Sequence, residues 1–132
     1  MPALERHVTK QRPVYLNLVR IRLPLPGIVS ILHRLSGAAL FLVGLPLLLV
    51  GVERSLASPE TFEALRVTLS APLAKIVLIG LIWACLHHFC AGIRFLLLDI
   101  HRGIGLRAAR RSSGLVLAVS LALTLLVAVR LW

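Results

Sequence analysis

The chain has 132 residues, of which 58% are hydrophobic, whereas soluble domains carry only roughly 45–50% apolar residues. Its mean hydropathy of +0.93 therefore excludes an ordinary soluble domain and predicts an all-α membrane protein. The net charge of +10 does not indicate a nucleic-acid partner, because the basic residues are confined to particular loops between apolar runs.

Residues 1–27 form the first segment, a basic arm that we expect on the cytoplasmic side of the membrane. Pro13, Pro24 and Pro26 interrupt this arm, so any helix in it is short. The apolar run that follows is longer than the hydrophobic region of a secretion signal, so we expect it to remain in the mature protein.

Three apolar runs follow the arm, and each is long enough to cross a bilayer, which takes about 20 apolar residues. They cover about residues 28–52, 72–99 and 114–132, and we group them as one membrane domain over residues 28–132. Pro46 lies inside the first run, where proline is expected to bend a helix.

The loop between the first two runs contains the start signal of a short helix. Ser58 is placed to act as the N-cap and Pro59 to occupy the first helical position. Phe62, Leu65 and Leu69 would then form an apolar stripe, which predicts a helix lying along the membrane interface.

The distribution of charge predicts the topology of the chain. Basic residues gather before the first run and between the second and third, namely Arg6, Lys10, Arg12, Arg20, Arg22, Arg102, Arg107, Arg110 and Arg111. By the positive-inside rule, the N-terminus and the second loop are cytoplasmic, and the C-terminus lies on the opposite side. The same loops can attract anionic membrane lipids, or they can serve topology alone.

The second apolar run carries a histidine on a face of small residues. Ionisable groups in the hydrocarbon are expensive and usually functional. Ala84, Ala91 and Gly92 lie one turn before or after His88 on the same helical face. Such a face leaves space for a flat macrocycle, so His88 is a candidate axial haem ligand; the alternative is a hydrogen-bonded packing residue.

Two further histidines are weaker candidates for the same role. His87 points about 100° away from His88, toward the face that carries Trp83 one turn earlier, where the indole would crowd a macrocycle. His33, in the first run, is about 7 Å shallower than His88 by the helical rise. A bis-histidine site within this chain would therefore need a tilted haem.

Two arginines lie in the cytoplasmic half of the predicted membrane domain, together with His33. Arg34 and His33 lie about 9–10 Å inside the membrane and Arg94 about 7 Å inside, by the helical rise. Haem propionates need cationic partners when they leave water, so these three residues are candidates for the propionate region. The alternative is that both arginines extend to the surface without a partner.

Ser30 and Arg34 are four residues apart and share a face of the first span. A hydroxyl and a fixed cation at shallow depth can bind a quinone carbonyl and stabilise its reduced form. The alternative is that the Ser30 hydroxyl bonds to its own helix backbone.

Two stretches of the sequence resemble a known family. RPVYLNLVRIRLPLPGIVSILHRLSG, residues 12–37, resembles the N-terminal signature of the cytochrome b556 subunits of succinate dehydrogenase, and HFCAGIRFLLLD, residues 88–99, resembles their second motif. The number of spans and the topology also match, so the resemblance covers nearly the whole chain.

The resemblance implies one of two membrane-anchor chains of complex II, packed as a two-chain helix bundle in a bacterial-type inner membrane. His88 matches the axial ligand of haem b, with the second ligand supplied by the partner anchor. Ser30 and Arg34 match ubiquinone-site residues, while His33, Arg34 and Arg94 match positions near the haem propionates.

The implied partners are the second anchor, the iron–sulfur subunit and the flavoprotein subunit, which oxidises succinate. The chain would carry no catalytic centre of its own. It departs from the family motif at Phe95, where the pattern has a second histidine, and this puts a propionate contact from that turn in question.

Three alternative functions can be compared with the sequence. A small multidrug-type transporter would need an acidic residue in mid-membrane, and Asp99 lies at the end of the second run. A structural anchor without haem and the anchor of a fumarate-reducing quinol oxidoreductase both fit the same pattern of spans and charges.

Overall fold

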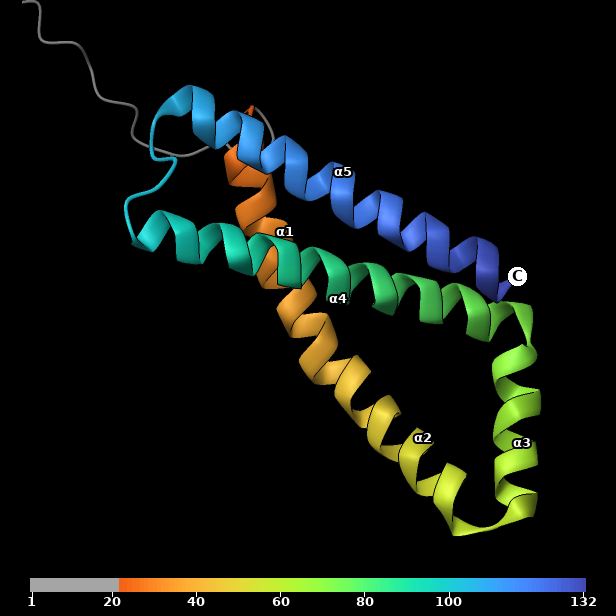
Figure 1. The fold of residues 1–132 in the computed structure, drawn as a ribbon. Coiled ribbons are helices and arrows are strands. Elements are labelled where there is room, and N and C mark those ends of the chain that lie inside the picture. The colour runs from red at the N-terminus through yellow and green to blue at the C-terminus, as the bar shows by residue number, and fades with distance from the viewer. Residues whose placement is uncertain (1–21) are drawn as a thin grey trace, which may run out of the picture.

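A computed structural model describes residues 22–132, and the fold of this part is entirely helical (Figure 1). The elements in chain order are α1 (Leu25–Ala39), the π-helix η1 (Leu40–Gly44), α2 (Leu45–Ala57), α3 (Pro59–Ser70), α4 (Pro72–Asp99) and α5 (Leu106–Leu131). Three continuous helices are long and apolar enough to cross a membrane: Leu25–Ala57, Pro72–Asp99 and Leu106–Leu131. The prediction of an all-α membrane protein with three spans is confirmed.

The helical ends differ from the predicted runs at three places, one of them the end of the first helix at Ala57 instead of about residue 52. The first helix begins at Leu25, with Pro26 in its first turn, and most of the predicted arm lies outside the described residues. The third helix begins at Leu106, about two turns before the apolar run, because the basic segment from Arg107 to Ser113 is itself helical. Apolar composition marks the membrane-crossing part of a helix and not its hydrogen-bonded ends.

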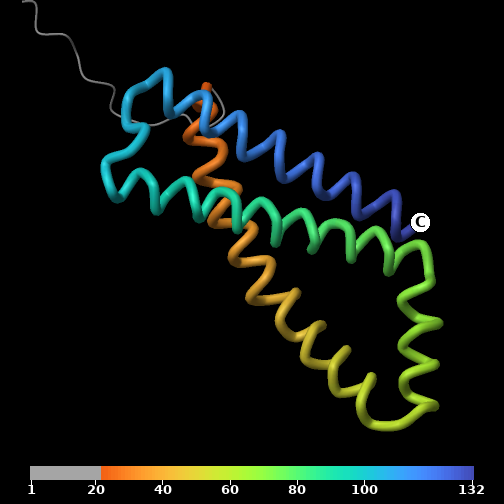
Figure 2. Tube along the Cα trace, viewed as in Figure 1, coloured from red at the N-terminus to blue at the C-terminus, as the bar shows by residue number. Residues whose placement is uncertain are grey.

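The first span changes direction at η1. The backbone N–H of Leu45 bonds to the carbonyl of Leu40, a wide turn that inserts one residue into the α-helical repeat. Pro46 follows directly and has no N–H to donate. The tube trace in Figure 2 shows the consequence, since α1 crosses α4 closely while α2 diverges from it and makes no close contact with it.

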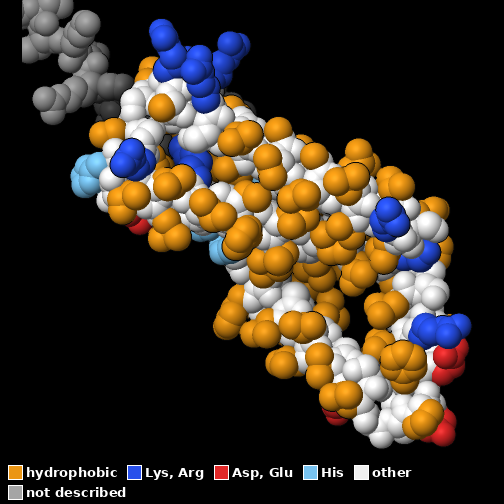
Figure 3. All heavy atoms as spheres, viewed as in Figure 1, with side chains coloured by type: hydrophobic (Ala, Val, Ile, Leu, Met, Phe, Trp, Pro, Cys, Tyr) orange, Lys and Arg blue, Asp and Glu red, His pale blue; other side chains and the backbone are white. Residues whose placement is uncertain are grey.

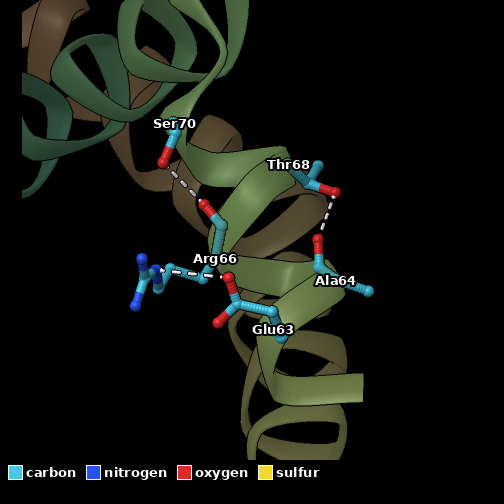
Figure 4. A network of polar contacts seen from close by, with 5 residues as sticks. All are labelled: Glu63, Ala64, Arg66, Thr68 and Ser70. Carbon is cyan, nitrogen blue, oxygen red and sulfur yellow. Dashed lines mark hydrogen bonds and ion pairs between the residues drawn. The ribbon is translucent and has the colours of Figure 1, made fainter. Parts of the chain in front are cut away.

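α3 connects α2 to α4, and it begins at the predicted start signal, with Ser58 as the N-cap and Pro59 as the first helical residue. Ser58 and Thr61 form a reciprocal capping box, with Thr61 N donating to Ser58 Oγ at 3.3 Å and Ser58 N to Thr61 Oγ1 at 3.1 Å. Further along α3, Thr68 and Ser70 donate to backbone carbonyls one turn earlier, and Arg66 pairs with Glu63 at 3.7 Å (Figure 4). Most of these polar contacts lie within α3, but Oγ1 of Thr61 also donates to the carbonyl of Arg54 at 2.8 Å and so joins the start of α3 to the last turns of α2.

α4 and α5 pack antiparallel along most of their length (Figure 2). Small side chains line this contact and let the backbones approach: Ala84 and Ala91 on α4, and Ser113, Val116, Ser120 and Thr124 on α5, are all buried. Val29 of α1 joins Ala91 and Val116 in the core. The outer face is covered by hydrophobic side chains, and Lys and Arg side chains gather around the α4–α5 connection (Figure 3).

Candidate functional site

The site lies where α1 crosses α4. His33 of α1 and His88 of α4 are stacked, with ring centroids 4.1 Å apart and planes 10° from parallel. From the sequence, His33 was expected to lie about 7 Å shallower in the membrane than His88. The two helices cross, however, and the crossing brings the rings into contact. Face-to-face rings cannot bind one metal ion from opposite sides, so His33 and His88 do not form a bis-histidine site in this arrangement.

The position of hydrogen atoms on His88 follows from its contacts. Nδ1 of His88 lies 3.0 Å from the carbonyl oxygen of His33 and 3.2 Å from Oγ of Ser36. A carbonyl can only accept, so Nδ1 carries the hydrogen and the lone pair of the neutral ring is on Nε2. Among the described residues Nε2 has no hydrogen-bond partner, which is the state of a metal-ligating imidazole whose other nitrogen is anchored.

Gly37 was part of the sequence motif but had no assigned role. A Cβ atom placed there would lie 2.8 Å from Cε1 and 3.3 Å from Nδ1 of His88, so only glycine allows the imidazole to lie against the α1 backbone. Ser36 was likewise missed. The signal that could have found both residues is a Ser-Gly pair that follows His33 by one helical turn.

The space beside His88 is not where the small residues of the sequence predicted it. Ala84 and Ala91 are 5% and 0% exposed, so that side of α4 is filled by this chain and offers no room for a macrocycle. Gly92 remains partly open, with only Nε2 of His33 within 4 Å of a Cβ placed there. The residues fit a haem approached through the free Nε2 of His88 and the Gly92 side.

His87 is enclosed by the helix core. Its side chain is 0% exposed and stacks on Trp83, with ring centroids 5.3 Å apart. Its two ring nitrogens and Nε1 of Trp83 are buried with no hydrogen-bond partner among the described residues. The expected crowding by Trp83 is therefore present, and His87 has no open side toward a haem.

Ser30 and Arg34 meet on the outer side of α1. Nη2 of Arg34 donates to Oγ of Ser30 at 3.3 Å, and Arg34 is exposed on the described part of the chain. Oγ of Ser30 accepts in this contact, so its own hydrogen is available to a further acceptor. The pair presents a cation and a hydroxyl donor together.

Arg94 is turned inward and is only 6% exposed, so it does not extend to the surface. Its Nε donates to Oγ of Ser112 on α5 at 3.0 Å, and that hydroxyl donates in turn to the carbonyl of Ala109 at 3.2 Å. Within residues 22–132 the only ion pair is that of Glu63 and Arg66, so no carboxylate of this part neutralises Arg94. Its terminal nitrogens can receive an anionic group.

Phe95 joins the two halves of the site. Its ring lies 5.0 Å from that of His33 and 5.4 Å from Cζ of Arg94. An aromatic side chain therefore occupies the position of the second histidine of the motif and packs near both His33 and Arg94.

The fold and the crossing of α1 and α4 define a three-span helical membrane protein with an anchored imidazole and nearby cations. Comparison with known proteins identifies its family. The chain belongs to the succinate dehydrogenase/fumarate reductase transmembrane subunit family, whose sequence model matches residues 8–127.

Individual relatives agree with this assignment. The succinate dehydrogenase cytochrome b556 subunit of Paracoccus denitrificans is 34% identical over 115 residues, which is 87% of this chain and 88% of the relative. The subunit of the same name from Coxiella burnetii is 35% identical over 123 residues, 92% of this chain and 98% of the relative. That of Rickettsia typhi is 30% identical over 126 residues, 96% and 98% of the two chains.

Proposed function

We propose that this chain is the haem b-binding membrane anchor of a succinate:quinone oxidoreductase. The observation that carries the proposal is the state of His88: its Nδ1 lies 3.0 Å from the carbonyl oxygen of His33, while its Nε2 has no hydrogen-bond partner among residues 22–132. The family assignment supports it, and the relatives bear the name cytochrome b556.

In this proposal His88 holds the iron through Nε2, and the second axial ligand comes from the partner anchor chain. Arg94 and Arg34 supply positive charge for the propionates, and His33 supplies a hydrogen-bond donor. The haem, when bound, provides a one-electron store beside the quinone site. Nε of Arg94 donates to Ser112, so the two terminal nitrogens can bind a carboxylate through two parallel hydrogen bonds.

Ubiquinone is the proposed substrate of the Ser30–Arg34 pair. Because Arg34 donates to Oγ of Ser30, the Ser30 hydroxyl is polarised and can donate its hydrogen to a quinone carbonyl. Negative charge develops on that oxygen during reduction, and the fixed guanidinium stabilises it. The pair therefore favours a reduced form that carries negative charge over the neutral oxidised quinone.

The proposed partners are the second anchor, the iron–sulfur subunit and the flavoprotein subunit, with succinate oxidised in the flavoprotein. The soluble subunits dock on the cytoplasmic face, where the basic α4–α5 connection lies, and the complex sits in a bacterial-type inner membrane. The family also includes fumarate reductase subunits, so an anchor of a fumarate-reducing quinol oxidoreductase is the second candidate. Succinate:ubiquinone and quinol:fumarate activities of the purified complex separate the two.

A dithionite-reduced minus oxidised spectrum of the whole complex tests the haem assignment. We expect the wild type to show a b-type α-band and His88→Leu to lose it. His87→Leu is the matched control, because it removes the neighbouring histidine from the same helix, and it should keep the band. A wild type without the band, or a His88→Leu complex that retains it, contradicts the proposal.

A further inference from the structure

We infer that Ser36, together with the main-chain carbonyl of His33, sets the redox potential of the haem that His88 binds. The inference rests on the proposed function. Ser36 is a positioning residue, because it acts on the iron only through the imidazole of His88.

Ser36 differs from the other buried serines. It is 4% exposed, its hydroxyl donates to the carbonyl of His33 at 2.9 Å, and its Oγ lies 3.2 Å from Nδ1 of His88 on another helix. Ser113 and Ser120 are also buried and donate to carbonyls of their own helix at 2.8 and 3.1 Å. Neither has a side-chain partner on another helix among the described residues.

Three polar atoms form a closed triangle that contains two hydrogens: Oγ of Ser36, the carbonyl oxygen of His33 and Nδ1 of His88. The Ser36 hydrogen goes to the carbonyl of His33, and the Nδ1 hydrogen of His88 faces both that carbonyl and Oγ of Ser36. The imidazole N–H is thus shared between two acceptors. Both acceptors lie on α1, one helical turn apart.

The geometry is specific to this turn of α1. Gly37, the next residue, provides the space in which the imidazole edge approaches the backbone, since a Cβ there would lie 2.8 Å from Cε1. The stacked ring of His33 limits the imidazole on another side. His88 is therefore held where both acceptors reach its N–H.

Acceptors on the outer nitrogen raise the basicity of a metal-ligating histidine. A more basic ligand donates more electron density and favours oxidised iron, which carries the higher positive charge. Hydrogen bonding around the axial ligand is accordingly one of the ways in which a protein adjusts a haem potential. Loss of Ser36 Oγ should raise the potential, because one of the two acceptors is removed.

The test is an optical redox titration of haem b in the purified wild-type complex and in three variants. For Ser36→Ala we expect full haem content and about a threefold higher reduced-to-oxidised ratio at the wild-type midpoint, which is a shift of about 28 mV at 59 mV per decade. Ser36→Thr retains the hydroxyl and should titrate as the wild type does. Ser113→Ala removes a buried serine that does not contact His88 and should also leave the potential unchanged.

Ser36→Cys provides a second measurement if the alanine complex does not assemble, because sulfur is a weak acceptor of similar position and should also raise the potential. An unchanged potential in the haem-containing alanine or cysteine variant overturns the inference and leaves the proposed function intact. An equal shift in Ser113→Ala overturns it as well. Absence of haem from the wild-type complex is the separate outcome that removes the proposed function.

Discussion

Replacement of Gly37 by alanine probes how closely α1 approaches the imidazole of His88. The added Cβ would lie 2.8 Å from Cε1 and 3.3 Å from Nδ1, whereas nonbonded carbon atoms settle about 3.5–4.0 Å apart. The ring must therefore move by roughly 0.7 Å or more. Such a displacement takes Nδ1, now 3.0 Å from the carbonyl of His33, out of hydrogen-bond range.

The energetic effect is the balance of two opposing changes. Overpacking a buried contact costs about 1–3 kcal/mol, while alanine in a helix is more favourable than glycine by about 0.8–1.0 kcal/mol. Gly51 and Gly80 are matched controls, because they lie in helices and nothing lies within 4 Å of a Cβ at either position. The controls should gain stability, so the gap between them and Gly37→Ala should be about 1–3 kcal/mol.

Two assays on the assembled complex measure this effect. Thermal unfolding followed by circular dichroism reports the stability gap, and the b-type α-band reports whether the complex keeps the haem that we propose His88 to bind. We expect Gly37→Ala to unfold at a lower temperature than both controls and to lose most of the band. A Gly37→Ala complex with the wild-type band and the stability of Gly80→Ala would refute the close approach of α1 to His88.

Other contacts of the site and of α3 give further predictions. Arg34→Ala should lower succinate:quinone activity about 10- to 100-fold, as expected for loss of a charged hydrogen bond of about 1.5–3 kcal/mol. Succinate oxidation with an artificial acceptor should stay unchanged. Equal losses in both assays would contradict a quinone role. Ser30→Ala removes a neutral donor, so its effect on quinone turnover should be smaller than that of Arg34→Ala, and the reverse order would be inconsistent with the pair. Ser112→Ala leaves Nε of Arg94 buried without its acceptor and should destabilise the complex by about 1–3 kcal/mol, read as a lower unfolding midpoint than that of Ser112→Thr. Ser58→Ala removes the N-cap of α3, which stabilises the helix by about 1 kcal/mol. Amide hydrogen exchange in the first turn of α3 should therefore accelerate about fivefold, with no change in the haem spectrum. Acceleration spread over all helices would argue against a local cap.

Local chemistry explains why the spans and the α3 start could be predicted. The number of apolar residues needed to cross a bilayer is a property of the chain and the lipid, and the Ser58 cap depends on atoms within three residues. The position of the π-helix was not predictable to the same degree. Pro46 indicated a bend, but the wide turn formed before it, between Leu40 and Gly44.

Ala84 and Ala91 did not mark a haem-facing side of α4. Small residues on one helical face indicate a close neighbour, but they do not say whether that neighbour is a cofactor or another helix. Here the neighbours are helices of the same chain, and both alanines are buried in the core. The same ambiguity concealed the inward turn of Arg94, because its partner Ser112 lies on a helix 18 residues further along the chain.

For the site itself, residue types and helical periodicity indicated a histidine at His88 with cations in the same half of the membrane. The contacts that orient this histidine depend on a second helix. His33, Ser36 and Gly37 are more than 50 residues away along the chain, and they reach His88 only because α1 crosses α4 at that depth. Val29 of α1 packs with Ala91 and Val116 in one core cluster, and distances between helices follow from such side-chain packing rather than from position within each helix.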